Sequence, residues 1–415
     1  VISGISEKDS EKLDTLSENN KEQIEKLTET AVQNAENTAE DSQLIANVVA
    51  VVNDELANKV VEEVSKTSTD EKQTLSAQVL KAIVDTDSGK IDIINDDVKD
   101  TMIEQTIESA KNQQEGIGIQ QSQDMTSIVS DIIVNTDAET AAKIIDEVNE
   151  TETNSNLSLK VISGISEKDS EKLNELSENN KEQMEQLTES AVQNAENTAE
   201  DSQLIANVVA VVNDDLVNVM IEEVSKTSTD EKQTLSAKVL QAIVDTEPDK
   251  MEVINDDVKD TMIEQTIESA KNQQEGTGIQ EQENFTDIIS DIIVNTDAET
   301  AAKIIDEVNE KSVEKRGIIA VSLSNESTFD KLVAQDFVFN SLIMSSLSKE
   351  VQQISSISDF LVAHKNSQAV LDALSDEKIE IVSLTITEKG YCYNSEKKGL
   401  DFTNQKIVED LSNIK

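Results

Sequence analysis

A long internal repeat constrains the fold of this chain more than any other feature of its sequence. The ten residues Val1–Ser10 return unchanged as Val161–Ser170, and Asp131 aligns with Asp291, which sets a period of 160 residues. The second copy is recognisable as far as Glu310. Near-identity over this length indicates a duplication. It predicts an array of similar units, residues 1–160 and 161–310, rather than one compact fold.

Each copy also contains a weaker half-period. Ala142–Thr151 resembles Asn58–Thr67, and Asn156–Val161 resembles Thr74–Val79. A structural unit of about half a copy, built from several short helices, follows from this pattern. Because a short helix is marginal alone, each one must bury its apolar side against neighbours, which favours an elongated helical array.

Cap signals and apolar spacing support the prediction of helices. Ser68 followed by Glu71, and Thr136 followed by Glu139, have the spacing of a capping box. Segments at 85–89, 135–137 and 149–154 are typical of turns, and 114–119 is predicted to be a connector. Apolar residues recur at helical spacing in two stripes, namely Ala141, Ile144, Ile145 and Val148, and Ile91, Ile94, Val98, Met102 and Ile107.

Composition changes abruptly near Lys311. The net charge is −50 over the chain, but only −3 of it falls between Lys311 and Lys415. Phe285 is the only aromatic residue before this point, whereas the only Arg, His and Cys follow it. These shifts predict a domain boundary near Lys311. The acidic part should repel nucleic acid and anionic membranes, and no apolar run is long enough to span a bilayer.

The pattern after the boundary is that of an α/β segment. Gly317–Leu323 is predicted to be a buried strand and Ser327–Ala334 a short helix. Phe337–Met344 and Val351–Ile357 are predicted strands, and a helix near Ala369–Leu374 leads into a dense apolar strand within Lys378–Tyr393. The predicted fold class is therefore mixed. A mostly α-helical acidic repeat array (1–310) is followed by a partial α/β Rossmann-type segment (about 312–415).

These tail residues resemble the mannitol dehydrogenase family of long-chain polyol dehydrogenases, which includes fructuronate and tagaturonate reductases. The most specific block is Ser-Leu-Thr-Ile-Thr-Glu-Lys-Gly-Tyr at Ser383–Tyr391. Gly317–Leu323, Ala369–Leu374, Gly399–Phe402 and Ile407–Leu411 match in the same order. The resemblance covers about the last hundred residues. It implies an NAD(P)-binding domain that transfers hydride between a nicotinamide and a sugar alcohol or keto-sugar.

The resemblance also implies where a cofactor would bind. Asn325 and Glu326 follow the Gly317–Leu323 strand, where an acidic residue bonds the adenosine ribose in Rossmann folds. Thr385, Thr387 and Glu388 lie at the presumed cofactor end of the last strand, and these five residues are the predicted NAD site. A surface turn and ordinary strand preference are the alternative explanations. Acidic repeat stands where the family has its Gly-rich phosphate loop. The catalytic Lys of the family and its partners have no match here, so no catalytic residue is carried over and the segment is expected to be inactive.

Two function classes follow. In the first, the chain carries part of an NAD-dependent oxidoreductase, cytoplasmic, with a small polyol or keto-sugar as substrate. In the second, it is a non-enzymatic acidic helical repeat protein, a spacer, adhesin-like arm or scaffold, whose surface suits a protein partner or diffuse cations. The abrupt end of the second copy at Glu310 also fits a fusion, deletion or assembly error that joined the tail to the repeat.

Overall fold

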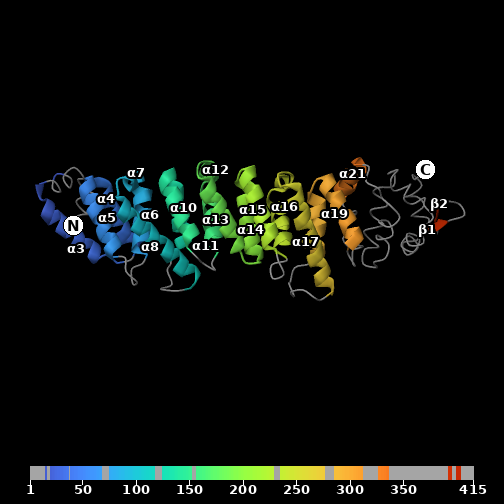
Figure 1. The fold of residues 1–415 in the computed structure, drawn as a ribbon, viewed down its shortest axis with the longest axis horizontal. Coiled ribbons are helices and arrows are strands. Elements are labelled where there is room, and N and C mark those ends of the chain that lie inside the picture. Colours follow the sequence, from blue (N-terminus) through green and yellow to red (C-terminus); the bar gives the residue numbers. More distant parts are fainter. Residues whose placement is uncertain are drawn as a thin grey trace. The chain divides into compact units, whose positions relative to one another are not determined.

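The computed structural model describes residues 15, 19–36, 38–67, 74–116, 124–151, 156–228, 234–275, 285–311, 326–335, 391–394 and 399–402. It divides into two compact units (Figure 1). Unit 1 comprises residues 1–196 and 207–223, and unit 2 comprises residues 197–206 and 224–415. The predicted domain limits at 160, 310 and 312 stay predictions.

Almost every element in the described ranges is a short α-helix. The helices that lie wholly in unit 1 are α3 (Lys21–Gln33), α4 (Ala39–Val51), α5 (Asp54–Thr67), α6 (Leu75–Asp87), α7 (Gly89–Asp92), α8 (Asp96–Gln114), α9 (Met125–Asn135), α10 (Ala138–Glu150), α11 (Leu157–Lys168), α12 (Ser170–Asn179) and α13 (Lys181–Gln193).

Two helices contribute residues to both units, and the remaining elements belong to unit 2. The shared helices are α14 (Ala199–Val211) and α15 (Asp214–Thr227). Unit 2 then continues with α16 (Leu235–Thr246), the 3₁₀ helix η1 (Pro248–Glu252), α17 (Asp256–Glu275), α18 (Phe285–Asn295), α19 (Ala298–Lys311), α21 (Glu326–Ala334), β1 (Tyr391–Asn394) and β2 (Gly399–Phe402).

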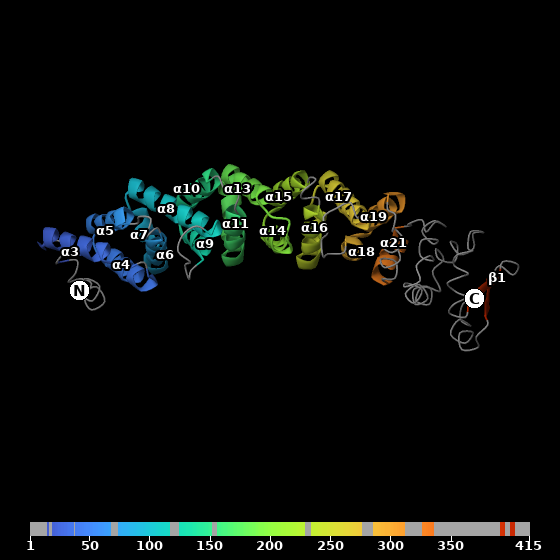
Figure 2. The ribbon, with the colours of Figure 1, turned by 90° about the horizontal axis from the view of Figure 1, so that it is seen from below.

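Within unit 1 the helices form two layers. In one layer α4 packs along α6, α6 along α9, and α9 along α11 (Figure 2). In the other layer α3 packs along α5, α5 along α8, α8 along α10, and α10 along α13. The half-period of the sequence is visible here, because α10 and α11 stand to the second half of the copy as α5 and α6 stand to the first. Within this unit the predicted stacking of short helices is confirmed.

Unit 2 repeats part of the same pattern. Helix α16 packs along α18 and α17, and α17 packs along α19. Helix α21 then lies on α19 and α18. The predicted short helix at 327–334 is therefore confirmed, with Glu326 as its first residue. It packs on the last helices of the repeat although it follows the predicted boundary at Lys311.

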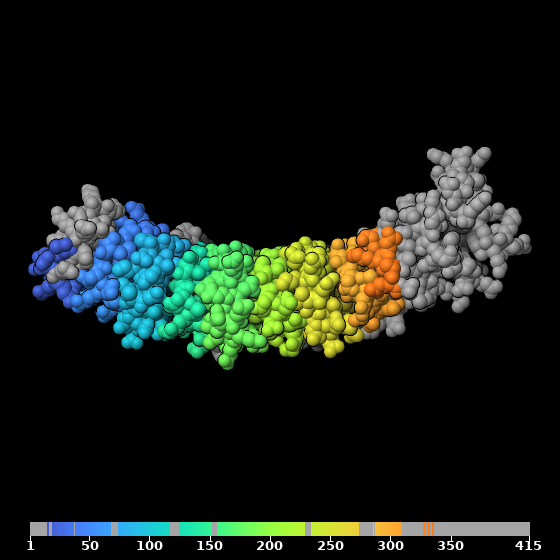
Figure 3. All heavy atoms as spheres, turned by 90° about the horizontal axis from the view of Figure 1, so that it is seen from above, coloured from blue at the N-terminus to red at the C-terminus, as the bar shows by residue number. Residues whose placement is uncertain are grey.

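The core of both units is aliphatic and lies between the helix layers. The predicted stripe on α10 is confirmed, since Ala141, Ile144, Ile145 and Val148 are each at most 2% exposed. The second stripe is buried at four of its five positions, but it belongs to two helices, because α7 ends at Asp92 and α8 begins at Asp96. Figure 3 shows side chains closing the spaces that separate the ribbons. Tight aliphatic packing, rather than aromatic residues, supplies the apolar burial that stabilises these helices.

The caps differ from the prediction in a consistent way. The N-cap of α10 is Asp137, whose carboxylate accepts a hydrogen bond from the Thr140 amide at 2.7 Å. The predicted capping box at Thr136 and Glu139 is therefore wrong, since the Thr136 hydroxyl instead donates to the Ile133 carbonyl. Aspartate wins because its ionised carboxylate is the stronger acceptor for the free amides of a first turn. Ser68 and Glu71 lie outside the described residues.

Two of the predicted turns need comment. The segment 135–137 separates α9 from α10, as predicted. Residues 85–87 are helical, because α6 runs to Asp87 before Ser88 separates it from α7. Gly116 has a φ of 68°, in the left-handed region that glycine enters without a steric penalty, and it follows the end of α8 as expected of a connector.

The described part of the tail contains one antiparallel ladder. Strand β1 pairs with β2, with Tyr391 opposite Phe402 and Cys392 opposite Asp401. The predicted strands at 317–323, 337–344, 351–357 and 379–386 lie outside the described residues, so the Rossmann-type sheet stays a prediction. Among the described helices, none is both long enough and apolar enough to cross a bilayer.

Candidate functional site

The structure describes only one of the five residues predicted to bind a cofactor. Glu326 opens α21, at a helix N-terminus where an acidic side chain is electrostatically favoured. Asn325, Thr385, Thr387 and Glu388 lie outside the described residues. The predicted NAD site is therefore neither assembled nor contradicted by the described residues, and it stays a prediction.

Helix α21 is the part of the tail whose setting is defined. Leu332 and Thr328 are fully buried, and the Lys331 ammonium donates to the Thr296 carbonyl at 3.1 Å. Thr296 closes the turn between α18 and α19, where the carbonyls that end α18 attract a cation. Apolar burial and this polar contact hold the start of the tail against the repeat. Glu326 is thereby fixed near the last helix pair of unit 2.

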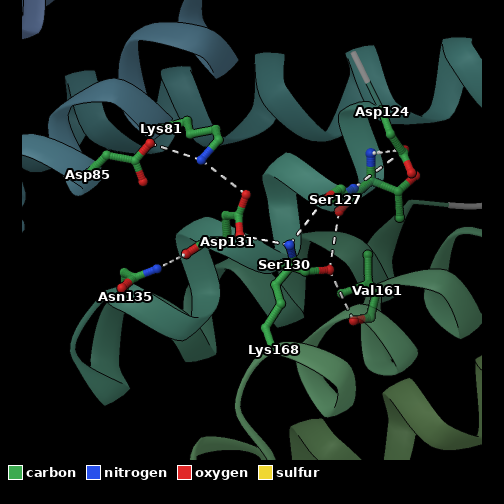
Figure 4. A network of polar contacts seen from close by, with 10 residues as sticks. Lys81, Asp85, Asp124, Ser127, Ser130, Asp131, Asn135, Val161 and Lys168 are labelled. Carbon is green, nitrogen blue, oxygen red and sulfur yellow. Dashed lines mark hydrogen bonds and ion pairs between the residues drawn. The ribbon is translucent and has the colours of Figure 1, made fainter. Parts of the chain in front are cut away.

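The most connected polar cluster in unit 1 joins α6, α9 and α11 (Figure 4). Asp131 on α9 accepts from Lys168 on α11 at 2.8 Å and from Lys81 on α6 at 3.1 Å. Lys81 also reaches Asp85 one turn along its own helix, at 2.9 Å. Partial burial works against the Lys81 charge, yet its hydrogen bonds to Asp85 and Asp131 hold the pKa of that ammonium above its ordinary value.

A serine beside these lysines invites comparison with a nucleophilic site. The Lys168 ammonium donates to the Ser127 hydroxyl at 3.1 Å, but it also forms the ion pair with Asp131, which favours the protonated amine. A protonated lysine cannot accept a proton from a serine, so it cannot activate Ser127. Ser130 is fully buried and bonds the carbonyls of Thr126 and Val161, both at 3.2 Å. The cluster is therefore a clasp between helices.

Close packing explains why the clasp forms at this place. A Cβ atom on Gly164 of α11 would lie 2.4 Å from the Ser130 hydroxyl oxygen. Only a glycine allows α11 to approach α9 so closely. Sequence reasoning aligned Asp131 with Asp291 but did not identify the clasp, because its two lysines lie 50 residues before and 37 residues after Asp131. The difference between Lys81 and its counterpart Gln241 was the one signal available.

A pair of carboxyl groups lies between α7 and α10. A hydrogen bond with Asp137, together with partial burial, raises the pKa of Asp92. The Thr140 amide in turn lowers the pKa of Asp137, so the proton is held on Asp92. In the described part of the chain, no group of three or more His, Cys, Asp or Glu side chains is placed to hold a metal ion. The pair therefore serves the cap of α10.

One cavity in unit 1 could hold a small molecule by its position. It has a volume of about 230 Å³ and lies between α3 and α4, with Val60 of α5 at its side. Its single carboxylate, Asp41, is engaged by the Glu36 amide at 2.7 Å. Pockets for ligands of drug size span roughly 300–1,000 Å³, so a nicotinamide dinucleotide is too large for this one.

Comparisons with known proteins agree with the resemblance found in the tail. An uncharacterized oxidoreductase, YeiQ, from Escherichia coli K12 is 33% identical over 97 residues, 23% of this chain and 20% of that protein. Mannitol 2-dehydrogenase from Pyricularia oryzae is 31% identical over 93 residues, 22% of this chain and 18% of the enzyme. Polyol:NADP oxidoreductase from Gluconobacter oxydans is 34% identical over 85 residues, 20% of this chain and 18% of the enzyme.

These matches define a partial likeness. Part of this chain resembles the mannitol dehydrogenase family, and the chain spans about a fifth of the length of the curated relatives it matches. No family model matches the sequence. An engineered protein of known crystal structure aligns with a TM-score of 0.35 at 13% identity, covering 93% of this chain and 99% of that one. At that score the likeness supports no conclusion about fold.

Proposed function

We propose that residues 312–415 form a nicotinamide-binding segment of the polyol dehydrogenase type, which is attached to an acidic helical scaffold. The observation that carries this proposal is the identity of 31–34% to enzymes named mannitol 2-dehydrogenase and polyol:NADP oxidoreductase. A nicotinamide cofactor accepts or donates the hydride in such reactions, while the protein binds and orients it. The substrate class is a sugar alcohol or keto-sugar.

The proposed cofactor is NAD, and the residues proposed to hold it are Asn325, Glu326, Thr385, Thr387 and Glu388. A carboxylate after a Rossmann strand accepts hydrogen bonds from the adenosine ribose hydroxyls and repels the extra phosphate of NADP. Glu326 is proposed for that role. Its place at the first residue of α21 is compatible with a strand-to-helix turn. No residue of this chain is proposed for proton transfer.

Cofactor binding is tested by titrating the 415-residue chain with NADH and following the fluorescence of the bound nicotinamide. We expect saturable binding, tighter for NADH than for NADPH, and a loss of about tenfold in Glu326→Gln. Glu299→Gln on α19, an exposed carboxylate outside the proposed site, is the matched control and should bind as wild type. Absence of saturable binding by either nucleotide would refute the proposal.

Turnover is measured separately with mannitol, fructose and fructuronate. Because no residue is assigned to proton transfer, we expect no NAD(H)-dependent turnover by residues 1–415. Clear turnover would show that the chain contains a catalytic group that the resemblance does not identify. Binding without turnover is the result that matches the proposal.

A scaffold function for the repeat is the second candidate, and the polar clusters of unit 1 favour it. The clasp at Asp131 joins three helices, and the Asp92–Asp137 pair supports a helix cap, so each has a structural explanation. A chain whose polar clusters serve packing is suited to present a surface or to separate attached parts. Circular dichroism of the full chain should show a predominantly helical spectrum. A spectrum dominated by strand would contradict this candidate.

A further inference from the structure

Two helices of nearly identical sequence have different surroundings in unit 1. Helix α3 reads Lys-Glu-Gln-Ile-Glu-Lys-Leu-Thr-Glu-Thr-Ala-Val-Gln, and α13 differs from it at three positions. Helix α13 packs against α10 and α11, and its Leu187 and Ala191 are fully buried. The matching residues of α3 are open. Leu27 is 41% exposed and Ala31 is exposed as well.

The open face of α3 continues into the cavity between α3 and α4. Ala31, Thr28 and Val32 line that hollow of about 230 Å³. Helix α3 is the first described helix of unit 1, drawn in dark blue in Figures 1 and 3. Leu27 is the one large apolar side chain that is exposed among the described residues. An apolar strip with a hollow beside it, on a chain of net charge −50, is unlike the rest of the described surface.

The interface that fits this face already exists within the chain. In unit 1 the α13 face is covered in part by α10, where the Asn149 amide donates to the Gln183 carbonyl at 3.1 Å. Burial against α13, reinforced by Glu150 and Glu182, raises the pKa of the Asp146 carboxyl on α10. The residues of α10, Ala138–Glu150, are repeated without a change as residues 298–310 of α19. The chain therefore carries both halves of a second interface of the same kind.

We propose that α3 of one molecule docks on α19 of a second copy of this chain and reproduces the packing of α13 on α10. The contact is heterologous, so it leads from one molecule to the next in a head-to-tail series. Leu27 and Ala31 become buried against the apolar stripe of α19, which contains Ile304, Ile305 and Val308. Repeat arrays extend by this same stacking of like surfaces.

Charge distinguishes α3 from α13 in a way that suits an intermolecular contact. Lys26 replaces Gln186 and adds a cation beside the apolar strip of α3. Helix α19 is acidic over its second half, with Asp306, Glu307 and Glu310. The local attraction acts against a strong general repulsion between two acidic chains. Salt screens the long-range repulsion over about 10 Å at 0.1 M, so association should strengthen as salt is added.

Helix α21 competes for the same partner surface. It lies on α19 within its own chain, where Leu332 is fully buried and Lys331 reaches the Thr296 carbonyl. Docking of α3 from a second molecule therefore requires α21 to leave α19. Helix α21 acts as a terminal cap of the array, and loosening it should promote association.

Sedimentation velocity of the full chain over a wide concentration range, at high salt, tests the proposal. We expect wild type to associate reversibly and Leu27→Asp to weaken association at least about tenfold, because a carboxylate cannot enter the apolar contact without loss. Leu332→Asp should strengthen association by freeing α19. Asn179→Asp adds the same charge at an exposed position on α12 and should behave as wild type.

A second measurement locates the contact. Wild-type chains labelled with ¹⁵N are mixed with unlabelled chains and treated with a zero-length carboxyl-to-amine cross-linker. Mixed-isotope peptides that join Lys26 to Asp306 or Glu310 are the expected product. Monomers in both wild type and Leu332→Asp would overturn the proposal. So would association of Leu27→Asp at the wild-type level, or mixed-isotope links that leave out α3. Circular dichroism confirms that each variant retains its helices.

Discussion

The two repeat copies share a sequence but not their surroundings. Asp131 in the first copy is clasped by Lys81 and Lys168. Its counterpart Asp291 has no ion pair within the described part of the chain, because Gln241 replaces Lys81 and tail sequence follows in place of α11. Burial, together with nearby Asp245 and Asp287, raises the pKa of Asp291. The aliphatic stripes, by contrast, are buried in both copies.

This difference separates what a repeat contains from what it borrows. The apolar residues that build each helix pair lie within a single copy, so duplication transmits them unchanged. The polar contacts use residues far apart in the chain, so they depend on which helix comes next. The same reasoning applies to α3 and α13, whose apolar faces are alike while only one of them is covered.

The largest expected effect contrasts Leu187 with Leu27. Leu187→Ala removes a fully buried side chain, and we expect it to lower the free energy of unfolding by roughly 2–5 kcal/mol. Leu27→Ala removes a side chain that is 41% exposed and should cost less than about 1 kcal/mol. Urea unfolding followed by circular dichroism measures both. Equal losses would show that the two faces are covered alike in solution.

The close contact of α11 with α9 gives the next prediction. Gly164→Ala places a Cβ 2.4 Å from the Ser130 hydroxyl oxygen and 3.0 Å from the Ser130 Cβ. Overpacking of this kind costs roughly 1–3 kcal/mol and outweighs the better helix propensity of alanine. Gly89→Ala is the matched control, since its Cβ would meet only the Asp87 carboxylate at an ordinary 3.5 Å. Combining Gly164→Ala with Ser130→Gly should restore part of the loss in thermal unfolding.

The helix caps test whether the two copies are equivalent where their contacts are local. Asp137 and Asp297 accept from the amides of Thr140 and Thr300 at 2.7 and 2.9 Å. Replacement of either aspartate by Ala should cost about 0.5–2 kcal/mol. Thermal unfolding of the two variants should give similar losses. A large difference would mean that the caps, like the clasp, depend on surrounding helices.

The pH dependence of the caps follows from the direction of their pKa shifts. The Thr140 amide is the main cause of the lowered pKa of Asp137, with further bonds to the Thr140 hydroxyl and Asp92. Burial opposes ionisation of Asp297, but its bonds to Thr300 and Glu299 lower the pKa overall. A folded pKa below the unfolded value of about 3.9 means that the stabilisation is complete above that pH and is lost as pH falls through the folded pKa. The Ala variants should therefore approach wild-type stability in strong acid.

Local sequence signals predicted much of the helical fold. The spacing of Ala141, Ile144, Ile145 and Val148 was enough to identify α10 and its buried face. The cap was misplaced by one residue, because Thr136 and Asp137 are both good caps and only the fold decides between them. The clasp at Asp131 could not be predicted, since it depends on which face of α6 and α11 meets α9. The tail was recognised from a motif, Ser383–Tyr391, that lies outside the described residues.

The smallest expected effect restores one lysine to the second copy. Gln241→Lys should bring an ammonium near Asp291, as Lys81 lies near Asp131, and an exposed ion pair is worth about 0–1 kcal/mol. Because the folded pKa of Asp291 is raised, this carboxylate destabilises the fold as pH rises through that pKa, and the penalty is present at neutral pH. The added lysine should lower this pKa, so its benefit should appear near neutral pH and vanish below about pH 3.9. Lys81→Gln is the reciprocal change and should cost a similar amount near neutral pH. Thermal unfolding of both variants, at low and high salt, measures the pair. If Gln241→Lys gives no gain at either salt concentration while Lys81→Gln is destabilising, the clasp depends on Lys168 and therefore on the presence of α11.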